Sequence, residues 1–465
     1  MTEHDYDVVV VGCGMAGLAA ALQATDHGME VAILEKAPKE RRGGHTQYTE
    51  SFRIPTAEID VEAPFNIDDY SSADFYSDIM DLTNYRADQK LAERVANRSG
   101  EMFEWLTEFG IDWEYQPPHP GYASGRVWHD GESLISTLID HLSKRDADIY
   151  YNTEAREFHR SDDGRVTRVE ARTNGERTQF NGAAVILAAG DYGSDKAKRT
   201  QYYGPGYGNM KVRGSRYNTG EAIDAAIDIG AKSDGEWGDA HMAIIDVESP
   251  DYEGGITRID GYQYGVIVNH NGERFVDEGE DVRTHTYAKF GQKIFEQPYH
   301  EAFIIVDSKT IDDVAHMGPG RPITGDSIES LANRLGIENV SNTVETVESF
   351  NEACDPSEYD PEILDGNDTD GVTPPKSHWA LPLDEPPFTG YPVTGGMTFA
   401  FGGVAITPDA EVLDTRDEPI EGLYAAGNAT GGLFYDNYPG ATGITNAAVF
   451  GMIAGRSAAE YVASR

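Results

Sequence analysis

Cysteine is almost absent from this chain of 465 residues, which contains only Cys13 and Cys354. Two thiols cannot supply the four ligands of an iron–sulfur cluster or of a cysteine-based zinc site, and no Cys-x-x-Cys-His motif for haem attachment occurs. We therefore expect no metal centre. Any redox chemistry of this chain would need an organic group.

Basic residues are scarce as well. The chain has 37 Lys and Arg residues against 80 Asp and Glu residues, which gives a net charge of −43. Such a charge repels nucleic acids and anionic membranes, so we expect neither as a partner. The acidic residues are spread over the whole chain, which favours the hydrated surface of a halophilic protein over a local acidic tail.

Long apolar runs are also missing. Only 39% of the residues are hydrophobic, and no stretch is long enough to span a membrane. The first residues lack the basic-then-apolar order of a signal peptide, so we expect a cytoplasmic protein. Its length exceeds the roughly 250–300 residues at which one core stops growing, which predicts two domains or one domain with a large insertion.

A dinucleotide-binding pattern occupies the start of the chain. An apolar run at 6–11 predicts a strand, a glycine-rich turn spans 12–17, a helix is expected at 18–27, and a second strand at 31–34 ends in Glu35. Gly12 permits the tight turn, Gly14 lets the backbone approach a pyrophosphate, and Gly17 allows close helix–strand packing. The alternative is a glycine-rich loop of any α/β protein, but the flanking strands and Glu35 favour a Rossmann-type fold.

The rest of the chain predicts a second domain inserted into the first. A strand at 183–188 and a helix at 218–229 continue the first domain, and mixed strands, loops and helices follow from about Trp237. We therefore predict an α/β protein with a Rossmann-type domain and an inserted α+β domain. The predicted boundaries are 1–237 for the first part of the Rossmann-type domain, 238–375 for the insert and 376–465 for the second part.

NAD and FAD share the glycine pattern of the first residues, and the segment 421–428, Glu-Gly-Leu-Tyr-Ala-Ala-Gly-Asn, distinguishes between them. It resembles the C-terminal flavin motif of the fumarate reductase and succinate dehydrogenase flavoprotein superfamily, in which the strand-end glycine and the next polar residue meet the ribityl chain. The resemblance covers nearly the whole chain and implies FAD as the cofactor, with the insert as a capping domain over the flavin. Further matching segments are 42–46, 188–190, 218–220, 271–278 and 402–404.

The glycine turn and the resemblance together predict a set of cofactor contacts. His45 occupies the place at which membrane-linked members attach FAD covalently, but it could equally be a hydrogen-bonding residue of the pocket. The predicted contacts are Gly12, Gly14, Met15, Ala16, Gly17, Glu35, Lys36, Gly43, Gly44, His45, Thr46, Ala155, Ala189, Gly190, Thr219, Gly220, Glu221, Gly427, Asn428, Gly443 and Ile444.

Within the superfamily, the chain looks most similar to the tricarballylate dehydrogenases, through segments 275–279, 287–289, 376–380, 391–394 and 437–440 and through Arg283. The resemblance implies an FAD-dependent dehydrogenase or reductase that acts on CH–CH bonds. Its substrate would be a small polycarboxylate resembling tricarballylate, or the matching unsaturated acid. The electrons would then pass to an acceptor protein, a quinone or a soluble acceptor.

Arg283 resembles the acid/base arginine of the superfamily, because it follows a Phe-Val-Asp-Glu run. Such an arginine can hold a carboxylate with its planar fork. The alternative is a surface arginine paired with nearby acids at 277, 278 or 281. His241 falls where the superfamily places a substrate-binding histidine, and its alternative is a histidine of the core.

Two departures from the superfamily affect the substrate. Thr398 and Phe399 stand where fumarate reductases have a second histidine, and Tyr438 stands where they have a second arginine. We predict Arg283, His241 and Tyr438 as catalytic residues and Thr398, Phe399 and Tyr435 as substrate contacts. A tyrosine-proline-glycine run similar to 438–440 also occurs in 3-ketosteroid dehydrogenases. An enone dehydrogenase of that type, or a flavoprotein subunit for electron relay, therefore remains an alternative.

Overall fold

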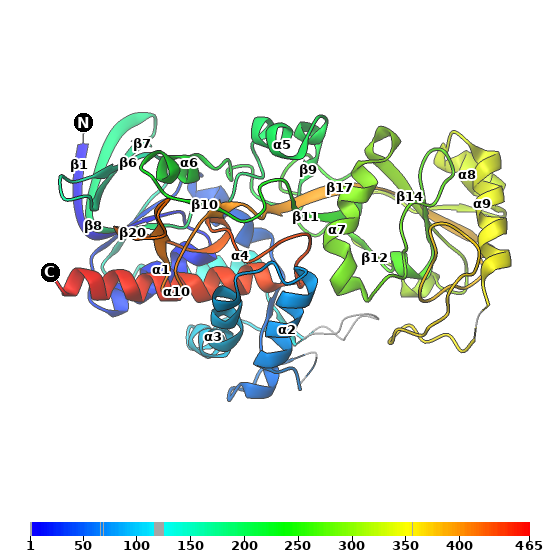
Figure 1. The fold of residues 1–465 in the computed structure, drawn as a ribbon, viewed down its shortest axis with the longest axis horizontal. Coiled ribbons are helices and arrows are strands. Elements are labelled where there is room, and N and C mark those ends of the chain that lie inside the picture. Colours follow the sequence, from blue (N-terminus) through cyan, green and yellow to red (C-terminus); the bar gives the residue numbers. More distant parts are fainter. Residues whose placement is uncertain (1, 66, 68, 116–124, 356) are drawn as a thin grey trace.

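The computed structural model describes residues 2–65, 67, 69–115, 125–355 and 357–465. These residues form an elongated molecule, with both termini in one lobe and helices α8 and α9 in the other (Figure 1). Two separate sheets organise the lobes. None of the described helices is both long enough and apolar enough to cross a membrane.

The first sheet has eight strands and contains the predicted Rossmann-type core. Its central strands β20, β8, β1, β2 and β5 are all parallel to their neighbours in that order, while β19, β7 and β6 add antiparallel pairs. Buried Val, Ile and Leu residues fill β2 and the last part of β1, residues 8–11, as expected for strands covered on both faces. The strands are β1 (Thr2–Val11), β2 (Val31–Leu34), β5 (Ala147–Tyr150), β6 (Thr153–Arg160), β7 (Val166–Thr173), β8 (Glu176–Leu187), β19 (Glu411–Leu413) and β20 (Pro419–Ala425).

Two helices rich in small residues pack closely against each other beside this sheet. A Cβ atom on Gly451 would lie 2.4 Å from the carbonyl oxygen of Ala16, and one on Gly455 would lie 2.2 Å from that of Ala20. Glycine therefore sets the close approach of α1 (Met15–Asp26) and α10 (Thr442–Ala463). The other helices of this lobe are α2 (Ser72–Leu82), α3 (Gln89–Thr107), α4 (Gly131–Leu142), α5 (Lys196–Tyr203) and α6 (Glu221–Asp228).

The second sheet has six strands around the long strand β17 (Phe388–Ala400), which runs from the middle of the molecule towards the second lobe (Figure 1). The other strands are β9 (Lys211–Val212), β11 (Ala240–Asp246), β13 (Val266–Val268), β14 (Glu301–Val306) and β16 (Ile323–Gly325). All pairings are antiparallel except β9 with β17. The predicted α+β character of the insert is thus present. The three-segment division of the chain stays a prediction, and the second sheet also takes β17 from the segment 376–465.

Helices α7 (Arg283–Phe295), α8 (Ile328–Leu335) and α9 (Val340–Ala353) accompany the second sheet. Two helices, α8 and α9, share the stretch 328–353 because Gly336 adopts a left-handed conformation, φ 76°, and ends α8. Three short strand pairs complete the fold: β3 (Ser51–Arg53) with β4 (Arg126–Trp128), β10 (Ser233–Asp234) with β18 (Gly403–Val404), and β12 (Ile259–Asp260) with β15 (Ala315–His316).

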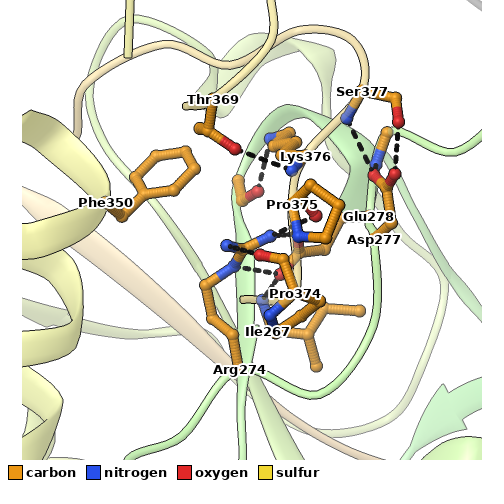
Figure 2. Close-up of polar contacts among 12 residues, drawn as sticks. Ile267, Arg274, Asp277, Glu278, Phe350, Thr369, Pro374, Pro375, Lys376 and Ser377 are labelled. Carbon is orange, nitrogen blue, oxygen red and sulfur yellow. Dashed lines mark hydrogen bonds and ion pairs between the residues drawn. The ribbon is translucent and has the colours of Figure 1, made fainter. Parts of the chain in front are cut away.

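A buried cluster of charges holds the loop before α7 in place, and Figure 2 shows its contacts. We call it the Arg274 cluster; it comprises Arg274, Asp277, Glu278, Lys376 and Ser377. Glu278 accepts hydrogen bonds from Arg274 and from the backbone of β13, while Arg274 also donates to the carbonyl of residue 374 at 2.9 Å. Lys376 donates to the carbonyl of residue 265 at 2.6 Å, and Ser377 donates to Asp277. The cluster therefore ties the segment 374–377 to the chain between β13 and α7.

Candidate active site

A single cavity is lined by residues from the glycine turn, the loop before α10 and the second sheet. Eighteen of the twenty-one predicted cofactor contacts line it, the exceptions being Gly17, Gly43 and Thr219. Arg283, His241, Tyr438, Thr398 and Phe399 line it too. Residues separated by more than 400 positions in the chain thus meet around one space.

The glycine turn has the geometry that its sequence predicts. Gly12 has a φ of 110°, and a Cβ atom there would lie 2.3 Å from the carbonyl oxygen of Ala188. A Cβ atom on Gly17 would lie 2.0 Å from the carbonyl oxygen of Gly12. Gly17 therefore acts through close packing of the turn against the helix and does not line the cavity.

Two helices begin at the cavity with N-cap residues that have no side-chain acceptor, and the N–H of Met15 in the first turn of α1 instead donates to the hydroxyl of Thr46 at 2.9 Å. These N-cap residues are Gly14 before α1 and Ala441 before α10. The first N–H groups of a helix carry partial positive charge and favour anionic groups. These ends suit the pyrophosphate and the electron-rich edge of a flavin.

Glu35 lies at the end of β2 and is 6% exposed. It accepts hydrogen bonds from the backbone N–H groups of Cys13 and Ala37, at 3.0 and 2.7 Å. Burial raises the pKa of Glu35 to about 6, although the backbone donors oppose this shift. The carboxylate is thus fixed at the cavity, where ribose hydroxyl groups would donate to it.

Three predicted cofactor residues also bind one another. Lys36 donates to Thr219 and to Glu221, each at 2.5 Å. This contact links the end of β2 to the start of α6. Gly43, in contrast, adopts a φ of 98° and packs against Ile135. The roles of these residues as direct cofactor contacts stay predictions.

The protein holds His45 by a hydrogen bond to one of its two ring nitrogens. Its Nδ1 atom accepts the backbone N–H of Ser215 at 2.9 Å, and its Nε2 atom lies 3.5 Å from Asp191. The Nε2 atom is buried without a hydrogen bond. Both expectations for His45, covalent attachment of the flavin and hydrogen bonding in the pocket, stay open.

Arg283 is buried, with 2% of its surface exposed, and begins α7. It pairs with Asp260 of β12, to which its Nε atom donates at 2.8 Å. The alternative of a surface arginine paired with acids at 277, 278 or 281 is therefore wrong. Those acids bind Ser377, Arg274 and His285 instead, because the loop before α7 directs them away from the cavity.

Asp260 joins Arg283 to a longer chain of alternating charges. Its other oxygen accepts from Arg258 at 2.9 Å, and Arg258 pairs with Glu50 at 2.6 Å. Burial alone would raise the pKa of Asp260, but the two guanidinium groups lower it to about 2. Asp260 therefore stays ionised and holds both arginines in place.

His241, Tyr287, Phe399 and Tyr438 form an aromatic group beside Arg283. The His241 ring lies 4.6 Å from the Tyr438 ring and 4.9 Å from the Tyr287 ring. Tyr287 and Tyr438 share a hydrogen bond of 2.7 Å between their hydroxyl groups, and the Arg283 guanidinium lies 4.1 Å from the centre of the Tyr287 ring. Tyr287 follows Arg283 by four residues, so both occupy one face of α7.

His241 is neutral in this setting. Burial, followed by the positive charges of Arg213, Arg283 and Arg258, lowers its pKa well below the ordinary value. Both ring nitrogens are buried, and neither has a hydrogen-bond partner among the described residues. A neutral imidazole offers one donor and one acceptor to a ligand in the cavity.

Tyr435 lies away from the cavity, unlike the other predicted substrate residues. Tyr435 is not among the residues that line the cavity, and the Arg86 guanidinium stacks over its ring at 4.6 Å. Its role as a substrate contact gains no support from this position, because three residues of an irregular loop can reverse the direction of a side chain.

Several residues at the site were not identified from the sequence: Arg126, Arg213, Arg258, Asp260 and Tyr287. A useful signal would have been the arginines themselves, since basic residues are scarce in this chain.

We call the part of the cavity around Arg283 the recess. It comprises Glu50, Arg126, Arg213, His241, Arg258, Arg283, Tyr287, Thr398, Phe399 and Tyr438, and Asp260 contacts it through Arg283.

Comparison with known proteins identifies the family. The model of a family described as "FAD binding domain" matches residues 7–444, which is almost the whole chain. The chain belongs to this FAD-binding family. The predicted FAD cofactor and the predicted Rossmann-type domain with a capping domain are thereby confirmed.

Two curated relatives and two solved structures show the nature of the family. The vinyl phenol reductase of Lactiplantibacillus plantarum is 29% identical over 99% of this chain and 98% of its own length. The NADH:fumarate oxidoreductase of Klebsiella pneumoniae is also 29% identical, over 98% of this chain, but the chain spans only 48% of that protein. The open conformation of a flavocytochrome c3 fumarate reductase is 26% identical, with a TM-score of 0.76 over 99% of this chain and 79% of that one.

A 3-ketosteroid Δ1-dehydrogenase from Sterolibacterium denitrificans has a TM-score of 0.77 at 22% identity, over 99% of this chain and 100% of that one, which shows a shared fold. Together with the family match, these relatives confirm that the chain is an FAD-dependent oxidoreductase of the reductase and dehydrogenase class.

Proposed function

We propose that the protein reduces the C=C bond of a small unsaturated carboxylic acid, or dehydrogenates the matching saturated acid. The observation that carries this proposal is the position of Arg283, which is buried in the cavity and supported by a chain of charges. FAD, when bound, supplies or accepts the hydride at its N5 atom. The relatives named for fumarate, acrylate and urocanate support a substrate with a carboxylate or a conjugated C=C bond.

Arg283 has two tasks in this mechanism. Its guanidinium holds the substrate carboxylate, and one of its N–H groups delivers a proton to the carbon next to the one that accepts the hydride. A lone guanidinium is a poor acid because its pKa exceeds 12. Arg283 is buried, so proton donation from it is coupled to the negative charge that develops on the substrate.

Asp260, Arg258 and Glu50 support the second task. After Arg283 has lost a proton, Asp260 is the group in contact with it, and Arg258 and Glu50 continue the contact towards the cavity wall. Glu50, whose side chain is partly exposed, can take up a proton from solvent, and Arg258 and Asp260 can pass a proton on to Arg283 before the next turnover, after which Asp260 is ionised again. In the dehydrogenation direction, the same atoms accept the proton that leaves the substrate.

His241 and Tyr438 position the substrate in this proposal. The one ring nitrogen of neutral His241 that carries a proton can donate a hydrogen bond to a carboxylate oxygen, and the hydroxyl group of Tyr438 stands in place of a charged carboxylate-binding residue. A tricarballylate-like tricarboxylate or its unsaturated counterpart remains the finer proposal. Its support is the abundance of arginine in the recess of a protein with a net charge of −43.

An enone dehydrogenase is the second candidate, and the Tyr287–Tyr438 hydroxyl pair favours it. Two hydrogen-bonded tyrosines can polarise a ketone oxygen. The arginines of the recess oppose this candidate, since an apolar ketone would leave their charges buried without a partner. Electron relay without a substrate is less favoured for the same reason.

The test uses the purified flavoprotein without air. The flavin is reduced with dithionite and then mixed with fumarate, acrylate, urocanate, cis-aconitate, 4-vinylphenol or an enone steroid, and the return of oxidised flavin absorbance is followed. The proposal expects the acids to reoxidise the flavin fastest. Faster reoxidation by the steroid or by vinylphenol would contradict it, and no reoxidation by any compound would favour the relay role.

A further inference from the structure

Arg213 lies directly after β9, is 8% exposed and lines the recess. Its Nε atom donates to the carbonyl of Gly255 at 3.2 Å, and its Nη1 atom donates to the hydroxyl of Thr398 at 3.0 Å. Both acceptors are uncharged. Within the parts of the chain that the structure describes, no carboxylate forms an ion pair with Arg213, and its Nη2 atom makes no hydrogen bond.

A buried cation without a counterion is unfavourable, because desolvation costs several kcal/mol that no partner returns. Arg199 shows how this chain can satisfy such a cation by itself. Its guanidinium donates to four backbone carbonyl groups and is enclosed by protein. Arg213 has two uncharged acceptors and a free Nη2 atom, so its environment is incomplete.

The neighbours of Arg213 belong to the substrate end of the cavity. Burial lowers its pKa first, and the positive charge of Arg258 lowers it further, while Glu50 and the hydroxyl groups of Tyr287 and Tyr438 act in the opposite direction. Glu50 is already paired with Arg258. Glu50 and Asp260, the two carboxylates here, form their ion pairs with Arg258 and Arg283 and none with Arg213.

We propose that Arg213 is a second carboxylate anchor, which binds a substrate carboxylate other than the one held by Arg283. The preferred substrates then carry at least two carboxylates. Thr398 orients the guanidinium by accepting from Nη1, and Nη2 is the atom that meets the substrate. This inference rests on the proposed function, since it assigns a specificity residue to the same site.

Binding to the oxidised flavoprotein tests the anchor without turnover. Fumarate, cis-aconitate and the monocarboxylate crotonate are titrated while the visible spectrum of the flavin is followed. Arg213→Gln should weaken binding of fumarate and aconitate by about 50-fold, as expected for loss of a charged hydrogen-bonded contact, and that of crotonate by less than about threefold. Arg213→Lys should recover only part of the loss, because an ammonium cannot reproduce the fork.

Arg216→Gln is the matched control. Arg216 lies three residues away, is half exposed and pairs with Glu253, so its loss should leave all three titrations unchanged. Flavin content and the thermal unfolding midpoint establish that each variant is folded. In the turnover assay, Arg213→Gln should raise KM for fumarate far more than it lowers kcat.

Three results would overturn the anchor: equal weakening of mono- and dicarboxylates, unchanged binding of dicarboxylates, or loss of flavin from folded Arg213→Gln, which would assign the residue to the cofactor. Failure of the proposed function is a separate result. A parent protein that binds fumarate but never reduces it would refute the proposed reaction. The role of Arg213 as a carboxylate anchor would then be judged from the binding titrations alone. A parent that binds none of the three acids would refute both.

Discussion

The recess and the Arg274 cluster both bury arginine beside carboxylate, but they complete their charges differently. In the Arg274 cluster, Arg274 and Lys376 balance Asp277 and Glu278, and the backbone carbonyls of residues 265, 374 and 375 accept further hydrogen bonds from these two cations (Figure 2). In the recess, Arg213 has no carboxylate partner and both nitrogens of His241 are unsatisfied among the described residues.

This difference distinguishes a structural site from a binding site. A buried polar cluster that satisfies all its own groups gains nothing from a ligand, whereas an incomplete one lowers its free energy when a ligand of the right charge enters. We therefore expect changes in the Arg274 cluster to affect folding and changes in the recess to affect substrates.

The largest expected effect is that of Arg283→Gln. The variant should keep its flavin but slow flavin reoxidation by the best acid by at least about a thousandfold, equivalent to roughly 4 kcal/mol of barrier, because it loses both the carboxylate fork and the proton donor. Anaerobic stopped-flow absorbance measures the rate. Lys289→Gln, on the same helix but exposed and paired with Glu280, is the control. A rate within a few-fold of the parent would show that another group carries the chemistry.

The next effect is on stability. Glu278→Gln leaves Arg274 as a buried cation without its counterion, so we expect it to lower the free energy of unfolding by about 3 kcal/mol. Denaturant unfolding measures this change, and Glu280→Gln, which alters an exposed carboxylate, is the control. The rate per folded, flavin-loaded molecule should stay at the parental value. If Glu278→Gln lowered the rate but not the stability, the Arg274 cluster would not differ from the recess in the way proposed.

A smaller effect concerns pH and Lys376. Burial lowers the pKa of Lys376 from 10.5 to about 8, although the charge of Glu278 opposes the shift. Between these two values the unfolded chain binds more protons than the folded one, so this residue makes the free energy of unfolding rise with pH over that window. We expect the parent to gain about 2 kcal/mol relative to Lys376→Met between pH 8 and pH 10. A constant difference between the two proteins would contradict the shift.

The smallest expected effect is that of salt on the buried clusters. Buried ion pairs are screened little, so the loss of unfolding free energy caused by Glu278→Gln should change by less than about 0.5 kcal/mol between dilute buffer and molar salt.

The thermal unfolding midpoint of the parent itself should rise with salt, because its net charge of −43 causes self-repulsion. A midpoint independent of salt would contradict the halophilic prediction.

The sequence was sufficient for the N-terminal βαβ unit because each of its requirements is local. Gly12 must reach a positive φ, Gly17 must touch backbone, and β1 and β2 must be apolar, and every one of these properties shows in neighbouring residues. The same holds for FAD, since the segment 421–428 carries its own motif. Arg283 was found because it follows a recognisable run of residues.

Only the tertiary structure revealed the charges of the recess. Arg213 follows β9, Asp260 lies in β12 and Arg283 begins α7, and no periodicity in the sequence connects these positions. Whether a guanidinium is paired depends on which carboxylates the fold brings within a few ångströms, and Coulomb interactions act through space rather than along the chain. The sequence therefore specified the cofactor and its fold, while the way the second sheet packs with its loops decided which arginine has no carboxylate partner among the described residues.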